Sequence, residues 1–282
     1  DKDCPAIEPI VEGIYKERAG EEEDIFVTNE EALLLKDKSA MLIVVDVNLP
    51  AMTECPELLK SVSTIVVLDH HRQNNETIKN AVVSYVEPYA SSTCEMVAEI
   101  LQYIVDKPKL KNIEADAMYS GILVDTDNFV IKAGVRTFEA AAFLRRAGAD
   151  VTRVRKMFRE DMEHCRIRTA IINKAEIYMD EFAISTFDGA NVSGATVVGA
   201  KAANALLNIQ GIRGSFVLTS LQDCIYISAR SIDELNVQVI MEKFNGGGHL
   251  TMAAAQLKNV TLEEAKQQLE DVLQQMREDG DI

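Results

Sequence analysis

Two short apolar runs in the first third of the chain are rich in valine and isoleucine. Residues 41–47 (MLIVVDV) and 64–68 (TIVVL) have the length and composition of strands that are buried on both faces. The first run contains Asp46, and Asp69 directly follows the second. Helical patterns follow at 92–105 and 113–122. Because buried strands that alternate with helices are typical of a parallel sheet, this part of the chain is predicted to be an α/β domain.

The pattern changes at residues 149–178, a long charged stretch without glycine or proline. Its arginines are interleaved with acidic residues, so we interpret it as a solvent-exposed connecting helix with i,i+4 charge pairs rather than a nucleic-acid-binding stripe. Strand and helix patterns then resume and end in an amphipathic helix at 261–278, where Thr261 and Glu264 fit a capping box. Further strands are expected at 182–187, 215–221 and 225–230, and further helices at 200–207 and 234–244.

These patterns predict two α/β domains joined by a helix. The expected boundaries are 1–160 for the first domain, 161–178 for the connecting helix and 179–282 for the smaller second domain. A length of 282 residues agrees with two domains, since a domain usually has roughly 100–200 residues.

The charge balance excludes one class of partner. The chain has 29 basic and 45 acidic residues, a formal net charge of −16, so its surface repels nucleic-acid backbones on average. The aromatic content of 6%, with no tryptophan, also argues against a stacking platform for long single strands. A phosphate ligand therefore requires a metal ion or a compact arginine site.

The cysteines and the hydropathy indicate a soluble, cytoplasmic polypeptide. Five scattered cysteines without a CxxC pair are typical of reduced thiols in the cytosol. No apolar run approaches the roughly 18–20 residues of a membrane span, and the first residues do not resemble a signal peptide. Because the sequence begins with Asp1 rather than Met, we expect it to be part of a longer protein.

Acidic residues and histidines coincide at the ends of the apolar runs. A third run, 121–124, ends at Asp125, so Asp46, Asp69 and Asp125 are expected to converge at the carboxyl edge of one parallel sheet. His70 and His71 follow directly, and imidazole with carboxylate is a ligand set for Mn, Fe or Zn. Taken singly, each acid is equally explained as a helix cap, and the histidine pair as surface residues. Their joint occurrence favours a metal site.

Two further segments have features of an anion site. Ser91 and Ser92 open a helix, whose free backbone N–H groups attract anions, although ordinary N-capping explains them as well. The run Gly246-Gly247-Gly248-His249 lets the backbone approach a ligand closely, whereas a helix stop needs only one glycine. Arg230, at the end of a predicted strand, is a suitable guanidinium partner for a phosphate.

In this order, the motifs resemble those of the DHH phosphoesterase superfamily. Val45-Asp46, Asp69-His70-His71, Tyr89-Ala90-Ser91-Ser92 and Asp125 resemble its second, third and fourth metal-site motifs. Ile227-Ser228-Ala229-Arg230-Ser231, Asn236-Val237-Gln238 and Gly246-Gly247-Gly248-His249 resemble its DHHA1 substrate-binding domain. Within the superfamily, the motifs most resemble the membrane-anchored bacterial cyclic-di-AMP phosphodiesterases, and oligoribonucleases of the nanoRNase type are the next relatives.

The resemblance implies a parallel-sheet DHH domain joined by a long helix to a smaller α/β DHHA1 domain, with the active site in the cleft between them. It also implies a pair of Mn²⁺ ions that activate water to hydrolyse cyclic di-AMP to linear pApA, with further hydrolysis to AMP left open. The implied metal ligands are Asp46, His70 and Asp125, and the implied catalytic residues are His71 and Asp69. The implied substrate-binding residues are Ser91, Ser92, Arg230, Asn236, Gly246, Gly247, Gly248 and His249.

The sequence departs from the family pattern in two places, and these departures leave other functions open. The first metal motif, a His and two Asp, is missing, and no His precedes Asp46, so we expect an incomplete dinuclear centre and weak or no activity in this chain. Asn48 stands where the anchored phosphodiesterases tend to carry His. An oligoribonuclease for short linear RNA and a non-catalytic nucleotide sensor therefore stay open, whereas the DHHA1 motifs argue against a pyrophosphatase.

The resemblance also makes expectations about partners and location. The substrate would be a cyclic dinucleotide or a short oligonucleotide, with no long nucleic acid, and the relatives imply a homodimer. The parent protein would be anchored in the cell membrane through a segment outside this chain, with the present residues on the cytosolic face.

Overall fold

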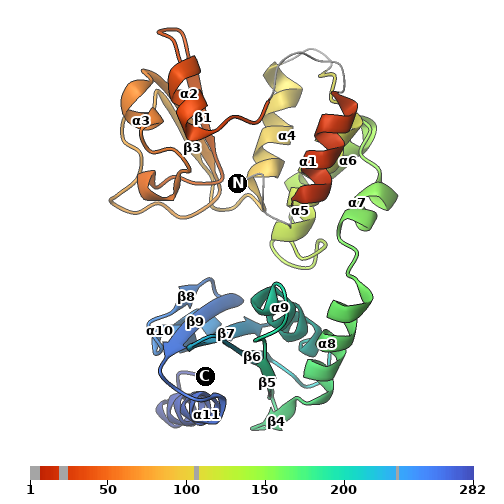
Figure 1. The fold of residues 1–282 in the computed structure, drawn as a ribbon, viewed down its shortest axis with the longest axis vertical. Coiled ribbons are helices and arrows are strands. Elements are labelled where there is room, and N and C mark those ends of the chain that lie inside the picture. The colour runs from red at the N-terminus through yellow and green to blue at the C-terminus, as the bar shows by residue number, and fades with distance from the viewer. Residues whose placement is uncertain (1–6, 19–24, 105–107, 233–234) are drawn as a thin grey trace. The chain divides into compact units, whose positions relative to one another are not determined.

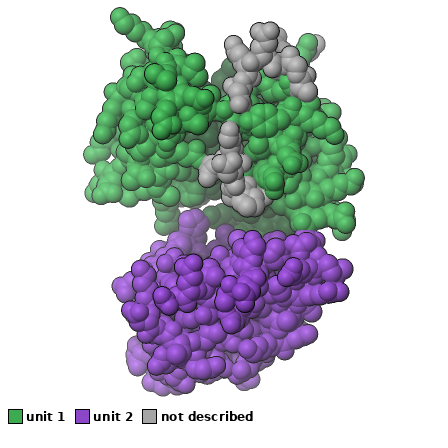
Figure 2. All heavy atoms as spheres, in the orientation of Figure 1, with its two compact units in different colours: residues 1–159 green, residues 160–282 purple. Residues whose placement is uncertain are grey.

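The computed structural model describes residues 7–18, 25–104, 108–232 and 235–282 (Figure 1). Two sequence predictions, the helix end at Val105 and the helix start at Glu234, lie outside these residues, as does Cys4. The chain forms two compact units, residues 1–159 and 160–282 (Figure 2). Within the described residues, no helix combines the length and the apolar character needed to span a membrane.

The first unit contains a small parallel sheet. Strands β1 (Met41–Val45), β2 (Thr64–Asp69) and β3 (Val83–Val86) lie in the order β1-β2-β3, and both neighbouring pairs are parallel. The two predicted strands are thereby confirmed, and β3 is an additional one. Alternate residues of the central strand, Ile65 and Val67, are buried in the core of this sheet. The parallel pairing brings the carboxyl ends of β1 and β2 to the same edge.

The other elements that the structure describes in the first unit are helical. α4, α5 and α6 pack against one another around fully buried Ile122, Ala140 and Leu144. The helical elements are α1 (Glu8–Glu17), α2 (Asn29–Leu35), the 3-10 turn η1 (Pro50–Met52), α3 (Leu58–Ser61), α4 (Thr93–Ile104), α5 (Asn112–Asp125), α6 (Val135–Arg146) and α7 (Val151–Met157).

The expectation that Asp125 ends a strand is wrong. Residues 121–124 belong to the last turn of α5, and Asp125 is the final residue of that helix. A four-residue apolar run fits a strand and a buried helix segment equally well, and only its length in context distinguishes them. Here the helix runs for 14 residues, and the apolar run passes from its buried side at Ile122 to its exposed side at Val124.

The second unit is a six-stranded mixed sheet between two layers of helices (Figure 1). Its order is β4-β5-β6-β7-β9-β8, and β5 and β6 form its one parallel pair. The strands are β4 (Glu176–Tyr178), β5 (Phe182–Asp188), β6 (Gly214–Leu221), β7 (Cys224–Ser231), β8 (Gly247–Gly248) and β9 (Met252–Lys258). The helices are α8 (Met162–Asn173), α9 (Ala195–Leu206), α10 (Val237–Glu242) and α11 (Leu262–Asp279).

Side-chain alternation along the strands builds a core on each face of this sheet. Phe182 and Phe216 pack on the face covered by α10 and α11, whereas Ala183 and Val217 pack on the face covered by α8 and α9. The predicted capping box of α11 is confirmed, since the Thr261 hydroxyl accepts from the backbone N–H of Glu264 at 3.2 Å.

The single helix predicted over 149–178 is divided. α7 ends at Met157, and α8 starts after Asp161, whose side chain accepts from the backbone N–H of His164 at 2.8 Å and so caps a new helix. α8 in turn ends at Asn173, and residues 176–178 pair with β5 as strand β4. The charged composition of residues 149–178 is compatible with one continuous helix, and it does not reveal that Asp161 caps a new helix.

Candidate metal centre

The ends of β1 and β2 bring the first two predicted ligands together. Asp46 directly follows β1, and its backbone N–H donates to the carbonyl of Leu68 on β2 at 3.0 Å. The residue has a φ of +64°, a left-handed conformation that Asp tolerates better than most residues because its short polar side chain bonds locally. His70 follows the last residue of β2, so both side chains lie at the carboxyl edge of the sheet.

His70 faces two carboxylates. Its Nε2 atom lies 3.6 Å from Oδ1 of Asp46 and 3.8 Å from Oδ2 of Asp125, and the side chain is only 7% exposed. Its Nδ1 atom lies 3.4 Å from the carbonyl oxygen of Ala90. A proton on Nδ1 satisfies that carbonyl and leaves the Nε2 lone pair directed at the carboxylates, which is the usual arrangement of a metal-binding histidine.

Asp69 holds His71 in place. Its Oδ1 atom accepts from the backbone N–H of His71 at 3.1 Å and lies 2.8 Å from Nδ1 of the ring, while Oδ2 accepts from Nδ2 of Asn48 at 2.5 Å. Asp69 is fully buried, whereas the His71 side chain is 43% exposed. Asp69 thus fixes the orientation of the His71 ring through its Nδ1 atom.

The donor atoms converge closely enough for a cation. One ligand atom each of Asp46, His70 and His71 lies within 4.8 Å of the others, and the rings of His70 and His71 meet edge to face at 4.5 Å. Burial raises the pKa of the Asp125 carboxyl, the charge of Asp46 adds to this rise, and His70 opposes it. Imidazole and carboxylate that meet in this way fit a divalent cation, whose charge would relieve the repulsion between the two acids.

Asn48 supplies a further observation that fits a polar ligand. Its Nδ2 atom donates to Asp69, but its Oδ1 atom is buried and accepts no hydrogen bond from the described residues. A buried acceptor without a donor is costly unless water or another ligand completes it. The amide thus orients Asp69 with one end and leaves an acceptor with the other.

Two residues of this centre were missed in the sequence. The hydroxyl of Thr93 donates to Oδ1 of Asp46 at 2.8 Å, so the start of α4 orients the acid at the end of β1. Next to it, burial raises the pKa of the Cys94 thiol to about 12, and the charges of Asp125 and Asp46 add to the rise. The sequence shows only that small hydroxyl residues stand at the start of α4. It does not indicate which acidic residue their side chains contact.

The structure places Ser91 and Ser92 inside the protein. Both are fully buried, and both bond Glu95: the Ser91 hydroxyl donates to its Oε2 atom at 2.6 Å, and the Ser92 hydroxyl accepts from its backbone N–H at 3.0 Å. This is the capping arrangement that explained the two serines equally well in the sequence. Their predicted contact with substrate stays a prediction.

The predicted residues of the second unit lie on β7, α10 and the hairpin of β8 and β9. Arg230 is in β7, where Nη1 donates to the carbonyl of Ala229 at 2.8 Å. Asn236 caps α10, since its Oδ1 atom accepts from the backbone N–H of Gln238 at 3.0 Å. His249 is exposed and donates its backbone N–H to the carbonyl of Met252 at 2.6 Å. Their roles toward substrate remain predictions.

The three glycines are not equivalent. A Cβ atom on Gly246 would lie 2.2 Å from the carbonyl oxygen of Ala254, and one on Gly248 would lie 2.3 Å from that of Met252. Gly248 also has a φ of +151°. These two glycines let β8 approach β9, whereas a Cβ atom on Gly247 meets nothing within 4 Å. The run is therefore explained in part by strand packing, and Gly247 alone is free of that requirement.

Comparison with known families matches both units. Residues 6–122 match the DHH family, N-terminal domain, and residues 184–278 match the DHHA1 domain. In the solved structures, the chain resembles an exopolyphosphatase-related protein from Bacteroides fragilis, with a TM-score of 0.76 and 19% identity over 96% of this chain and 86% of the other. This likeness shows the fold.

Relatives that are similar in sequence carry names with a function. The chain is 46% identical to the cyclic-di-AMP phosphodiesterase PdeA of Listeria monocytogenes, over 86% of this chain and 37% of the relative. It is 38% identical to the cyclic-di-AMP phosphodiesterase GdpP of Bacillus subtilis, over 90% of this chain and 39% of the relative. The bifunctional oligoribonuclease and PAP phosphatase NrnA of Mycoplasma pneumoniae is 22% identical, over 84% of this chain and 74% of the relative. The chain thus spans less than two fifths of the two phosphodiesterases.

Proposed function

Because the chain belongs to the DHH family, with a DHH domain followed by a DHHA1 domain, we propose that it is the catalytic region of a metal-dependent phosphodiesterase that hydrolyses cyclic di-AMP to linear pApA. The observation that carries the proposal is the convergence of His70 with the carboxylates of Asp46 and Asp125. The substrate is taken from the relatives PdeA and GdpP, both named as cyclic-di-AMP phosphodiesterases.

Asp46, His70 and Asp125 would hold the metal ion, which we propose to be Mn²⁺, one of the ions that mixed imidazole and carboxylate ligands can bind. A divalent ion in such a site polarises phosphoryl oxygens and makes water a better nucleophile. Among the described residues, these three ligands serve one ion. The second ion that the resemblance implies would need ligands in addition to them.

The protein's own residues would position the diester. His71 would contact the phosphate being cleaved through Nε2, because Asp69 occupies Nδ1 and fixes the ring. In the second unit, Arg230 would pair with another phosphate, and the exposed backbone at Gly247 and His249 would contact the nucleotide. Local cations are needed for each phosphate because the chain as a whole carries a net charge of −16.

The test is hydrolysis of cyclic di-AMP with and without Mn²⁺, followed by chromatographic detection of pApA. The 282-residue chain is compared with a chimera that carries the corresponding upstream region of the Listeria relative. We expect Mn²⁺-dependent turnover that EDTA abolishes and that is greater in the chimera. Absence of pApA in both proteins, when Mn²⁺ binding is confirmed by calorimetry, would contradict the proposal and favour a nucleotide sensor.

The likeness to NrnA supports a second candidate, an oligoribonuclease for short linear RNA. Both candidates use the same metal ligands, so the substrate distinguishes them. Cleavage of pApA or of short RNA, with cyclic di-AMP left intact under the same conditions, would favour the oligoribonuclease.

A further inference from the structure

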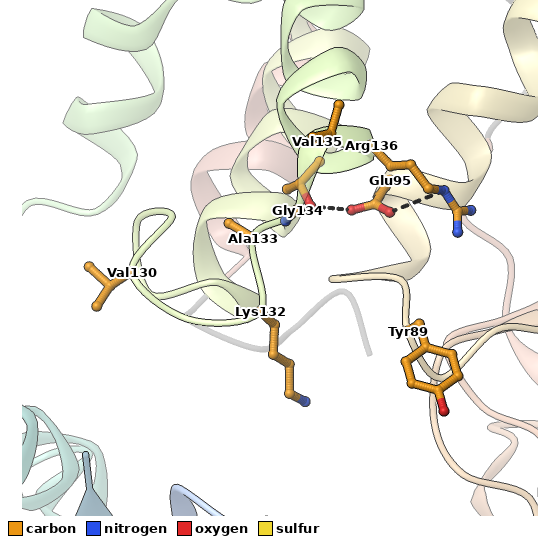
Figure 3. Close-up of a pocket in the computed structure, with 9 residues that line it drawn as sticks. Tyr89, Glu95, Val130, Lys132, Ala133, Gly134, Val135 and Arg136 are labelled. Atoms are coloured by element: carbon orange, nitrogen blue, oxygen red, sulfur yellow. Dashed lines mark hydrogen bonds and ion pairs between the residues drawn. The ribbon is translucent and has the colours of Figure 1, made fainter. Parts of the chain in front are cut away.

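A cavity of about 520 Å³ lies in the first unit between the loop before α4 and the loop before α6. Its lining residues include Tyr89, Glu95, Val130, Lys132, Val135 and Arg136 (Figure 3). The volume is within the range of small-ligand sites. Figure 3 shows that Lys132 and Tyr89 extend from different loops toward the same side of the Glu95–Arg136 pair.

Two cationic side chains line the cavity: Arg136 is paired with acidic residues, and Lys132 is not. Arg136 is bound to Glu99, with Nη2 2.7 Å from Oε2, and its Nε atom lies 3.9 Å from the buried carboxylate of Glu95. The ammonium group of Lys132 forms no hydrogen bond or ion pair with any residue that the structure describes. A lysine that lines a cavity in this state is a ready partner for a phosphate.

The rest of the lining suits a nucleoside. Tyr89 is 93% exposed, so its ring is open to stacking, and the lining also includes the exposed apolar side chains of Val130 and Val135. An aromatic face stacks on nucleobases without regard to their identity. An exposed aromatic ring and apolar groups beside a single cation are the features of a site for one base with its phosphate.

Two contacts place the cavity beside the candidate metal centre. Ala90, which follows Tyr89, offers its carbonyl to His70. Thr93, two residues before Glu95 on α4, donates to Asp46.

We propose that this cavity binds one nucleotide of the substrate, with Tyr89 stacked on the base and Lys132 paired with a phosphate. The inference rests on the proposed function, because it assigns part of the same substrate. It adds two substrate-binding residues that lie in the first unit, separate from the metal ligands and from the residues of the DHHA1 domain.

The test measures binding of AMP and adenosine by NMR titration in the presence of EDTA, so that neither metal nor hydrolysis contributes. Lys132→Met keeps the length of the side chain and removes the charge, and we expect it to raise the Kd for AMP about tenfold. Tyr89→Ala should raise the Kd for AMP and for adenosine about tenfold, whereas Lys132→Met should leave adenosine unchanged. Matched controls are Lys79→Met and Tyr103→Ala, both at exposed positions outside the cavity.

Three results would overturn the assignment: no binding of AMP by the unsubstituted chain, an unchanged Kd in both variants, or equal losses in the controls. A failure of the proposed function gives a different pattern. In that case cyclic di-AMP would stay intact with Mn²⁺ present, while the AMP titrations would still distinguish the variants from their controls.

Discussion

The Nδ1 atoms of His70 and His71 each contact another group of the protein. Nδ1 of His70 contacts a backbone carbonyl, and Nδ1 of His71 contacts the buried carboxylate of Asp69. These contacts fix the tautomer and the orientation of each ring before any ligand arrives. At the scale of single residues, activity should therefore depend on groups that touch neither metal nor substrate.

Asp69→Asn tests this dependence. The amide would turn a donor toward Nδ1 of His71 or toward Asn48, both of which now donate to Asp69. We expect kcat to fall about ten- to a hundredfold with little change in KM, as for other partners of functional histidines. Steady-state kinetics measures this, with Asp223→Asn on an exposed turn as the control. A rise in KM at constant kcat would contradict a positioning role.

Thr93→Val removes the donor to Asp46 and preserves the shape of the side chain. Since outer contacts of this kind orient metal ligands, we expect the affinity for Mn²⁺ to fall about tenfold. Calorimetric titration with Mn²⁺ gives the comparison, and Thr152→Val on the exposed side of α7 is the matched control. Equal affinities in the two variants would show that Asp46 does not need this hydroxyl.

At the scale of elements, the hairpin of β8 and β9 depends on two of its three glycines. A Cβ atom at Gly246 or Gly248 would overlap a backbone carbonyl of β9, which cannot move without breaking the ladder. We expect Gly246→Ala and Gly248→Ala to lower the free energy of unfolding by about 1–3 kcal/mol. Gly247→Ala should change it by less than about 0.5 kcal/mol, because the added atom meets open space. Urea denaturation measures all three, and equal losses would refute the packing argument.

The start of α8 contains a pH-dependent contact. The pKa of His164 is raised, first by its hydrogen bond to the carbonyl of Ser193 and then by Asp161. Protonated His164 therefore stabilises the second unit below the ordinary pKa of about 6.5, and this contribution is lost as pH rises through the higher folded value. We expect a loss within the range of about 0–1 kcal/mol between pH 6 and 8, as for other exposed pairs. His164→Gln should flatten this part of the stability profile in chemical denaturation; an unchanged profile would show that another group is responsible.

Elements whose pattern is long or strongly periodic could be predicted from the sequence. β1, β2 and the capped α11 are present where the pattern indicated them. The position of Asp125 on a helix was missed because a run of four apolar residues fits the pattern of a strand as well as that of a helix. The break between α7 and α8 was missed because Asp161 resembles the other charged residues of the segment 149–178. The contacts of Thr93 and Glu95 join residues that lie more than 40 positions apart, which no local pattern encodes.

At the scale of the whole chain, the candidate metal ligands all belong to residues 1–159. An ion bound only by the folded state stabilises the part that holds it, by about 2.7 kcal/mol at a concentration 100-fold above Kd. We therefore expect Mn²⁺ to slow hydrogen exchange at the ends of β1 and β2 and in α5, and to leave β5 to β7 unchanged. Exchange measured by mass spectrometry with Mn²⁺, with Ca²⁺ as a comparison, tests this. Equal protection in both units would place ligands in the second one as well.

Helix α4 contacts both sites within its first turn, since Thr93 holds Asp46 and Glu95 lines the nucleotide cavity and bonds Thr137 of α6 at 2.6 Å. If binding of the metal ion or of the nucleotide shifts this turn, the geometry of the other binding site changes as well. Binding of metal and binding of nucleotide are then thermodynamically linked, and each must alter the affinity of the other by the same factor. The start of one helix would thus make the affinity for the nucleotide depend on the bound ion, and the affinity for the ion depend equally on the nucleotide.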